Sequence, residues 1–94
     1  MWNLYILQCR DGSLYTGVTI DIPNRLKRHN SGKGAKYTSA RRPCRLVYYE
    51  EYHSESEAKQ REREIKGWRR KEKIDLIRGF PSSALEAILR NSGQ

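Results

Sequence analysis

The sequence predicts an α+β fold whose elements follow the order β-β-α-β-α-α. Two β-prone runs flank a glycine-containing turn near the N-terminus, and a third β-prone run lies in the middle of the chain. Helix-start signals precede two amphipathic segments, one on each side of the third run. In a chain of 94 residues, these elements are enough for one domain with a single small hydrophobic core.

A β-hairpin is predicted at the N-terminal end. Its strands would cover 4–9 and 13–18, and Arg10-Asp11-Gly12 would form the turn. Gly12 suits the left-handed backbone conformation that a three-residue loop requires at this point. A two-residue Asp11-Gly12 turn is equally compatible with the residues, so both loops remain open.

The choice of loop decides where two tyrosines lie, because side chains along a strand alternate between the two faces of a sheet. The two-residue turn would pair Gln8 with Tyr15 and leave Tyr5 on the opposite face from Tyr15. The three-residue loop would pair Leu7 with Tyr15. It would also pair Tyr5 with Gly17, so that both tyrosines would share one face.

The first helix is predicted to begin after Asp21, which can cap the free amides, and to end at about Asn30. Pro23 is tolerated because the first turn needs no hydrogen bond from its nitrogen. The core-facing stripe contains two polar side chains, whose burial costs free energy unless they line a cleft. The stripe consists of Ile22, Arg25, Leu26 and His29.

A flexible basic loop is predicted over 31–36, and Arg41-Arg42-Pro43 should prevent a helix from continuing through this region. The third strand is predicted over 45–52. Ser54 and Glu57 then form a capping box, so the second helix should begin there and continue to about 66. Its inward stripe carries a carboxylate among Ala58, Arg61, Glu62 and Ile65.

A third helix is predicted over 69–78, with Ile74 and Ile77 as its apolar anchors and Pro81 as its stop. Residues 80–94 are expected to form a tail or a last short helix.

The charge distribution indicates a polyanionic partner. The chain carries 19 Lys and Arg against 11 Asp and Glu, a formal net charge of +8, and nucleic acid is the predicted partner, DNA before RNA. No acidic residue occurs from 22 to 49, whereas eight basic residues do. Lys33, Lys36 and Arg41 are the candidate phosphate contacts. A second basic cluster over 59–73 alternates with glutamates and is expected to form ion pairs along a helix.

Cys9 and Cys44 lack the spacing of a zinc site and make no disulfide framework, so we expect reduced thiols in a cytoplasmic protein. Cys9 is expected to be a small core residue. The apolar N-terminal stretch lacks the features of a signal peptide, and no apolar run is long enough to span a bilayer. No membrane partner is therefore expected.

Several polar residues are candidates for a site that hydrolyses phosphodiesters, a reaction that needs a base for water and positive charge at the phosphoryl oxygens. Glu62 suits Mg²⁺ or Mn²⁺, because Mg²⁺ keeps several waters and can take its other ligand from the substrate phosphate. Arg25 suits the developing phosphorane, because its guanidinium donates two hydrogen bonds and keeps its charge.

The same site would contain the hairpin tyrosines. Tyr5 or Tyr15 could take the proton from water if neighbouring cations or metal-bound water lower its pKa, and His29 would assist by a hydrogen bond. Gly17 is expected to supply a structural turn at the site.

The pattern formed by these residues resembles the GIY-YIG nuclease family, and most of all its small standalone bacterial members. It covers about residues 3 to 78, within a predicted domain at 1–79. The pattern reads Leu4-Tyr5-Ile6-Leu7, then Leu14-Tyr15-Thr16-Gly17, then Arg25 with His29 four residues later, then Ala58-x-x-x-Glu62 with Ile65-Lys66.

This resemblance implies a three-stranded antiparallel sheet flanked by helices and Mg²⁺-dependent cleavage of DNA. It implies that Tyr5 and Tyr15 face one site, which favours the three-residue loop. Tyr5 matches the family's candidate general base and Glu62 its metal ligand, while Tyr15, Arg25 and His29 match its other catalytic positions. Asn3-Leu4-Tyr5 stands where the family has Gly-Ile-Tyr, and Tyr15-Thr16-Gly17 where it has Tyr-Ile-Gly.

The predicted function is a metal-dependent endonuclease acting on DNA, in repair or in the processing of branched, damaged or single-stranded forms. One alternative is a nucleic-acid-binding module on the same fold that does not cleave, and another is an adaptor that docks on an acidic protein. Binding needs only positive charge, so the inward Glu62 favours the enzyme. Characterised relatives usually carry a second domain that selects the target, so a protein partner is expected to supply specificity.

Overall fold

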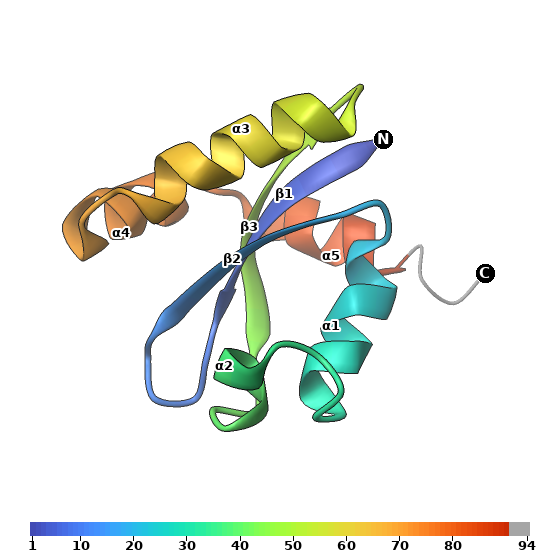
Figure 1. Ribbon diagram of the computed structural model, residues 1–94, viewed down its shortest axis with the longest axis vertical. Helices are drawn as coiled ribbons and strands as arrows, with labels where there is room; N and C mark the ends of the chain where they lie inside the picture. Colours follow the sequence, from blue (N-terminus) through green and yellow to red (C-terminus); the bar gives the residue numbers. More distant parts are fainter. Residues whose placement is uncertain (91–94) are drawn as a thin grey trace.

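A computed structural model describes residues 1–90 as three layers, in which a three-stranded antiparallel sheet lies between two pairs of helices. Helices α1 and α5 cover one face, and α3 and α4 cover the other (Figure 1). The predicted α+β class and its antiparallel sheet are confirmed. The elements are β1 (Trp2–Gln8), β2 (Leu14–Thr19), α1 (Ile22–Asn30), α2 (Lys36–Ser39), β3 (Arg45–Tyr52), α3 (Glu55–Lys66), α4 (Arg70–Arg78) and α5 (Ser82–Arg90).

The hairpin adopts the register of the three-residue loop. The sheet order is β2-β1-β3, and Leu7 lies opposite Tyr15 while Tyr5 lies opposite Gly17. Gly12 has the φ of +86° that this loop requires, and its N–H donates to the carbonyl of residue 9 at 2.8 Å. Tyr5 and Tyr15 consequently share one face of the sheet.

A β-bulge changes which residues of β3 face each side. Ile6 lies opposite Tyr48, but the next residue, Leu7, lies opposite Leu46, so Val47 is the extra residue. Val47 and Tyr48 therefore both pack toward α3, while Leu46 packs toward α1.

Each face of the sheet has its own buried cluster, and β1 contributes to both. Residues 3–7 of β1 are all buried, as expected for a central strand with helices on both sides. The cluster on the α1 side contains Tyr5, Leu7, Cys9, Ile22, Cys44 and Leu46. The cluster on the α3 side contains Leu4, Ile6, Val47, Tyr48 and Ile65.

The predicted helix caps are present. The Asp21 side chain accepts from the backbone N–H of Asn24 at 3.1 Å, and the Ser54 hydroxyl accepts from that of Glu57 at 3.2 Å. These bonds satisfy amides that would otherwise be free at the start of α1 and α3.

The structure contains two helices that the predicted order β-β-α-β-α-α does not include. Helix α2 lies at 36–39 and begins at the last residue of the segment predicted as a loop, and it has no side-chain cap. Helix α5 gives the last segment the short helix that was one of its two expected forms, and Leu85, Ile88 and Leu89 pack on the α1 side of the core. Residues 91–94 lie outside the described residues.

The ion pairs expected along α3 are confirmed. Lys59 pairs with Glu55 at 3.0 Å, and Lys66 pairs with Glu62 at 3.1 Å. Arg61 instead reaches across to β3, where its Nε lies 3.0 Å from Oε1 of residue 50.

Among residues 1–90, no helix has both the length and the apolar character needed to cross a bilayer.

Ile65→Ala is expected to lower the free energy of unfolding by about 2–5 kcal/mol, because Ile65 is 0% exposed and its removal leaves a cavity between α3 and the sheet. Urea denaturation followed by circular dichroism measures the change. Ile20→Ala is the control, since Ile20 is 65% exposed, and should stay within about 0.5 kcal/mol of the wild type. Equal losses in the two variants would contradict this description of the core.

Candidate active site

A chain of hydrogen bonds joins the central strand to α1 and α2. The Tyr5 hydroxyl lies 2.9 Å from Nε2 of His29. Nδ1 of His29 lies 2.7 Å from the hydroxyl oxygen of Thr38, which in turn donates to the carbonyl of Ala35 at 3.0 Å. Tyr5, His29 and Thr38 are at most 2% exposed. These contacts bring together two predicted site residues and one residue, Thr38, that was not predicted.

The hydrogen-bond partners determine which group donates and which accepts in each of these bonds. The single proton of the Thr38 hydroxyl is donated to Ala35, so the Thr38 oxygen must accept from Nδ1 of His29. In the neutral imidazole, Nδ1 then carries the ring proton and Nε2 is the acceptor. The Tyr5 hydroxyl therefore donates its proton to Nε2 of His29.

Aromatic rings extend this chain toward the surface. The Tyr15 ring lies 5.0 Å from the His29 ring and 6.4 Å from the Tyr5 ring, measured between centroids. Tyr37, on α2, lies 6.2 Å from Tyr15. Tyr15 is half-buried and Tyr37 is exposed, so these two rings form the side of the cluster that substrate can reach.

Two glycines make room for Tyr5 and His29. A Cβ at Gly17 would lie 2.6 Å from the Tyr5 hydroxyl oxygen, and a Cβ at Gly34 would lie 2.6 Å from Nδ1 of His29. The turn expected at Gly17 is wrong, because Gly17 lies inside β2, directly opposite Tyr5. Gly17 serves the site because its lack of a side chain leaves room for the Tyr5 hydroxyl. The turn of the hairpin lies at 10–12.

Arg25 and Glu62 bring opposite charges to Tyr5. Arg25 is exposed on α1, although the helical period predicted it to face the core, and the Glu62 side chain is 21% exposed on α3. Burial raises the pKa of Tyr5 well above its ordinary value of 10.0, Tyr15 and Glu62 raise that pKa further, and Arg25 lowers it. The expectation that cations would lower this pKa is wrong for Tyr5, because burial outweighs Arg25.

His29 is held in its neutral form. Burial lowers the pKa of His29 below its ordinary value of 6.5, and the charges of Arg25 and Arg28 lower it further. At neutral pH the imidazole is therefore uncharged and can accept the Tyr5 proton.

Glu62 provides one oxygen donor for a metal ion. Its Oε2 pairs with Nζ of Lys66 at 3.1 Å. Within residues 1–90, no group of three or more His, Cys, Asp or Glu side chains could surround an ion. A single hard carboxylate fits Mg²⁺, which keeps several waters and takes further oxygens from a substrate phosphate.

The predicted phosphate contacts surround α2. Lys33 and Lys36 are exposed, and neither has an ion-pair partner in the described part of the chain. Arg41 is more constrained, because its Nε lies 3.2 Å from Oδ2 of Asp11 and its guanidinium lies 4.0 Å from the Tyr37 ring centroid.

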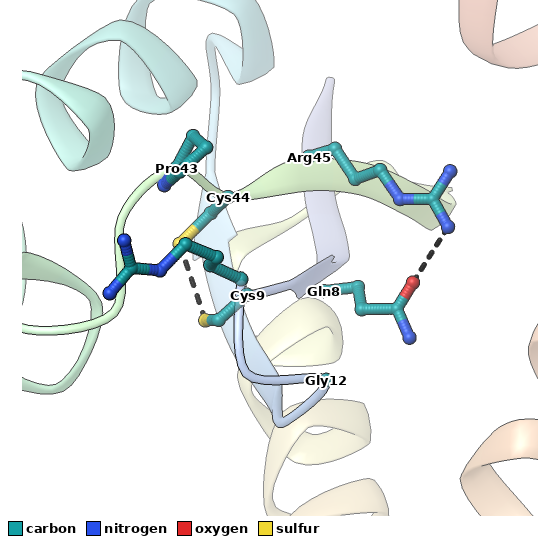
Figure 2. A pocket seen from close by; sticks show the side chains of 7 residues that line it. Gln8, Cys9, Gly12, Pro43, Cys44 and Arg45 are labelled. Atoms are coloured by element: carbon teal, nitrogen blue, oxygen red, sulfur yellow. Dashed lines mark hydrogen bonds between the residues drawn. The ribbon is translucent and has the colours of Figure 1, made fainter.

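A cavity of about 400 Å³ lies at the turn end of the hairpin (Figure 2), and neither Tyr5 nor His29 lines it. Cys9 and Cys44 meet in it, with the Cys44 thiol donating to the Cys9 sulfur at 3.2 Å. Both are free and buried, which confirms Cys9 as a core residue. Burial and the hydrogen bond to Cys9 raise the pKa of Cys44 to about 12, so this thiol is no nucleophile at neutral pH.

The structure adds three residues to the predicted site: Gly34, Tyr37 and Thr38. No local pattern singles out Gly34 or Thr38, because their roles depend on the position of His29 in space. Tyr37 had a usable signal, since an aromatic residue within a basic segment is typical of nucleic-acid-binding surfaces.

The sequence is similar to a known catalytic domain and to proteins from bacteria. A family model described as the GIY-YIG catalytic domain matches residues 1–75. A UPF0213 protein from Staphylococcus saprophyticus is 54% identical over 74 residues, which cover 79% of this chain and 90% of that protein. A UPF0213 protein from Staphylococcus aureus is 53% identical over 75 residues, which cover 80% and 92% respectively.

Two solved structures are similar as well. The solution NMR structure of a UPF0213 protein from Bacillus halodurans is 49% identical, with a TM-score of 0.53 over 82% of this chain and 83% of that one. The NMR structure of a protein from E. faecalis is 38% identical, with a TM-score of 0.56 over 81% of each chain. The matched region of the family model includes every residue from Tyr5 to Glu62 discussed above.

Thr38→Val is expected to lower the free energy of unfolding by about 1–3 kcal/mol, because the buried Nδ1–H of His29 loses its acceptor. Thr38→Ser keeps the hydroxyl and should retain most of the stability. Urea denaturation measures the energies, and ¹⁵N NMR of the imidazole shows whether the tautomer is lost in Val and kept in Ser. An unchanged tautomer in Thr38→Val would contradict the proposed direction of the protons.

Acidification from pH 7.5 to 5.5 is expected to destabilise the protein through His29. In the unfolded chain His29 binds a proton near its ordinary pKa of 6.5, whereas the folded protein resists protonation, so stability is complete above that value and declines below it. Urea denaturation across this range should show a smaller decline for His29→Gln. His53→Gln, at the other histidine, is the control and should decline as the wild type does.

Proposed function

The chain belongs to the GIY-YIG family, and on that premise we propose that it is a metal-dependent endonuclease that hydrolyses phosphodiester bonds in DNA. The observation that carries the proposal is the buried hydrogen bond between Tyr5 and His29, on which Arg25 and Glu62 both act electrostatically. A protein that only bound phosphates would gain nothing from a carboxylate beside them. Glu62 therefore supports hydrolysis over simple binding.

In this proposal, Tyr5 and His29 act together on the attacking water. The Tyr5 phenol keeps its proton at neutral pH because burial raises its pKa, so it is not a free phenolate. Its oxygen takes a proton from water as its own proton passes to Nε2 of His29, 2.9 Å away. The neutral state of His29 supports this direction of transfer, and Thr38 keeps the acceptor nitrogen turned toward Tyr5.

Arg25 and Tyr15 lie on the more exposed side of the same cluster. The Arg25 guanidinium is available to hydrogen-bond two phosphoryl oxygens as negative charge develops on them. The Tyr15 hydroxyl adds a neutral donor near the same oxygens. These roles need contact with substrate, which agrees with the partial exposure of both side chains.

Glu62 would hold Mg²⁺ or Mn²⁺. When bound, such an ion supplies positive charge to the phosphate and to the leaving oxygen. The chain's own contribution is one carboxylate whose orientation is supported by Lys66.

The proposal extends to the substrate and its setting. Lys33 and Lys36, with Arg41 beside α2, would bind the DNA backbone. We assign the protein to the cytoplasm, in keeping with its two free thiols, and to the repair or processing of unusual DNA structures, with a protein partner supplying target choice. The GIY-YIG-like domain would cover 1–79, followed by the segment that carries α5.

Tyr5→Phe, Arg25→Ala and Glu62→Gln are each expected to reduce cleavage about 100-fold or more, because each removes a group that acts on the reacting atoms. The measurement is cleavage of supercoiled, branched and single-stranded DNA in the presence of Mg²⁺ or Mn²⁺.

Matched control variants lie on the same helices. Glu55→Gln removes a carboxylate of α3 that, like Glu62, pairs with a lysine four residues later, and Lys27→Ala removes an exposed cation of α1. Both should retain cleavage to within a few-fold. If no preparation cuts DNA, or if all cut equally well, a nucleic-acid-binding module without activity becomes the better description.

A further inference from the structure

A pocket of about 200 Å³ lies beside the candidate active site. Two of its residues also touch that site: the Tyr15 ring lies 5.0 Å from the His29 ring, and Lys66 pairs with Glu62 at 3.1 Å. The pocket is therefore directly adjacent to the candidate active site. Its lining residues come from β2, α2, α3 and α4 and are Leu14, Tyr15, Thr16, Tyr37, Lys66 and Lys73.

Tyr37 provides an aromatic surface in this pocket. It is 38% exposed, so it contributes little to the buried core. Arg41 lies over its ring at 4.0 Å, and Arg41 is itself held by Asp11 at 3.2 Å and by the Tyr37 carbonyl at 3.0 Å. Arg41 covers one face of the ring and is not among the residues that line the pocket, so a base in the pocket would stack on the other face. Because Arg41 restricts the ring before any ligand binds, this stacking would cost little conformational entropy.

The remaining lining groups suit a nucleotide. Lys66 and Lys73 both line the pocket and bring positive charge suited to a phosphate. Lys73 has no ion-pair partner among residues 1–90, whereas Lys66 is paired there with Glu62 at 3.1 Å. Strand β2 is an edge strand, so the outward backbone groups along 14–16 have no strand partner. Such groups can hydrogen-bond the polar edge of a base without selecting its identity.

We propose that this pocket binds one nucleotide next to the scissile phosphate. Its base would stack on Tyr37, and its phosphate would contact Lys66 and Lys73. The inference rests on the proposed function, which supplies the scissile phosphate. A base inside a duplex already stacks on neighbours above and below, so only an unstacked base can lie on Tyr37. The substrate class is therefore DNA with an unpaired nucleotide beside the cleaved bond.

Fluorescence of 2-aminopurine tests this proposal. The probe is a single-stranded oligonucleotide that contains 2-aminopurine, compared with the same strand in a complete duplex, and EDTA prevents cleavage. The wild type should bind the single strand more tightly than the duplex and quench its fluorescence. Tyr37→Ala should weaken single-strand binding about tenfold and abolish the quenching, with duplex binding unchanged. Tyr37→Phe keeps the ring and should behave as the wild type.

Ile20→Ala is the matched control, because it removes an exposed apolar side chain just beyond the other end of β2 and should change neither binding nor quenching. The proposal is overturned if Tyr37→Ala binds the single strand as the wild type does, or if it weakens single-strand and duplex binding equally. Cleavage assays with Mg²⁺ separate the two proposals. Cleavage that is indifferent to Tyr37→Ala refutes the pocket alone, whereas a wild type that neither binds nor cleaves DNA refutes both.

Discussion

The hydrogen bond between Tyr5 and His29 ties the central strand to α1, and the rest of the site is arranged around it. Both groups are buried, so either one would be an unsatisfied polar group without the other. Thr38 completes the arrangement from α2 by accepting the proton of Nδ1. Three elements are thereby held in one orientation, and the Tyr5 proton points toward a neutral acceptor.

This interaction also explains the backbone around it. Gly17 and Gly34 have no side chain because the Tyr5 hydroxyl and the His29 ring occupy the space where a Cβ would project. With these two rings buried, Tyr15 and Tyr37 lie on the outer, more exposed side of the Tyr5–His29 pair. The pocket at Tyr37 is a consequence of that layering.

Local chemistry accounts for the parts that could be predicted from the sequence. Asp21 and Ser54 cap their helices through bonds to amides three residues away, so no distant contact is needed to find them. Helix α2 escaped prediction because its four residues have no side-chain cap and depend on the contact between Thr38 and His29. Arg25 lies on the predicted helix but is exposed, because helical periodicity gives an angle around the axis and not the depth of packing.

The resemblance of the pattern of tyrosines, Arg25, His29 and Glu62 to a known motif indicated the family, which the family model then showed. The α+β class was predicted separately, from the strand and helix periods of two and 3.6 residues. The protonation states of Tyr5 and His29 could not be predicted from the sequence. Burial raises the pKa of Tyr5 and lowers that of His29, and the Thr38 oxygen selects the tautomer. Desolvation and hydrogen-bond direction arise only when residues distant in sequence pack together, so they belong to the folded structure alone.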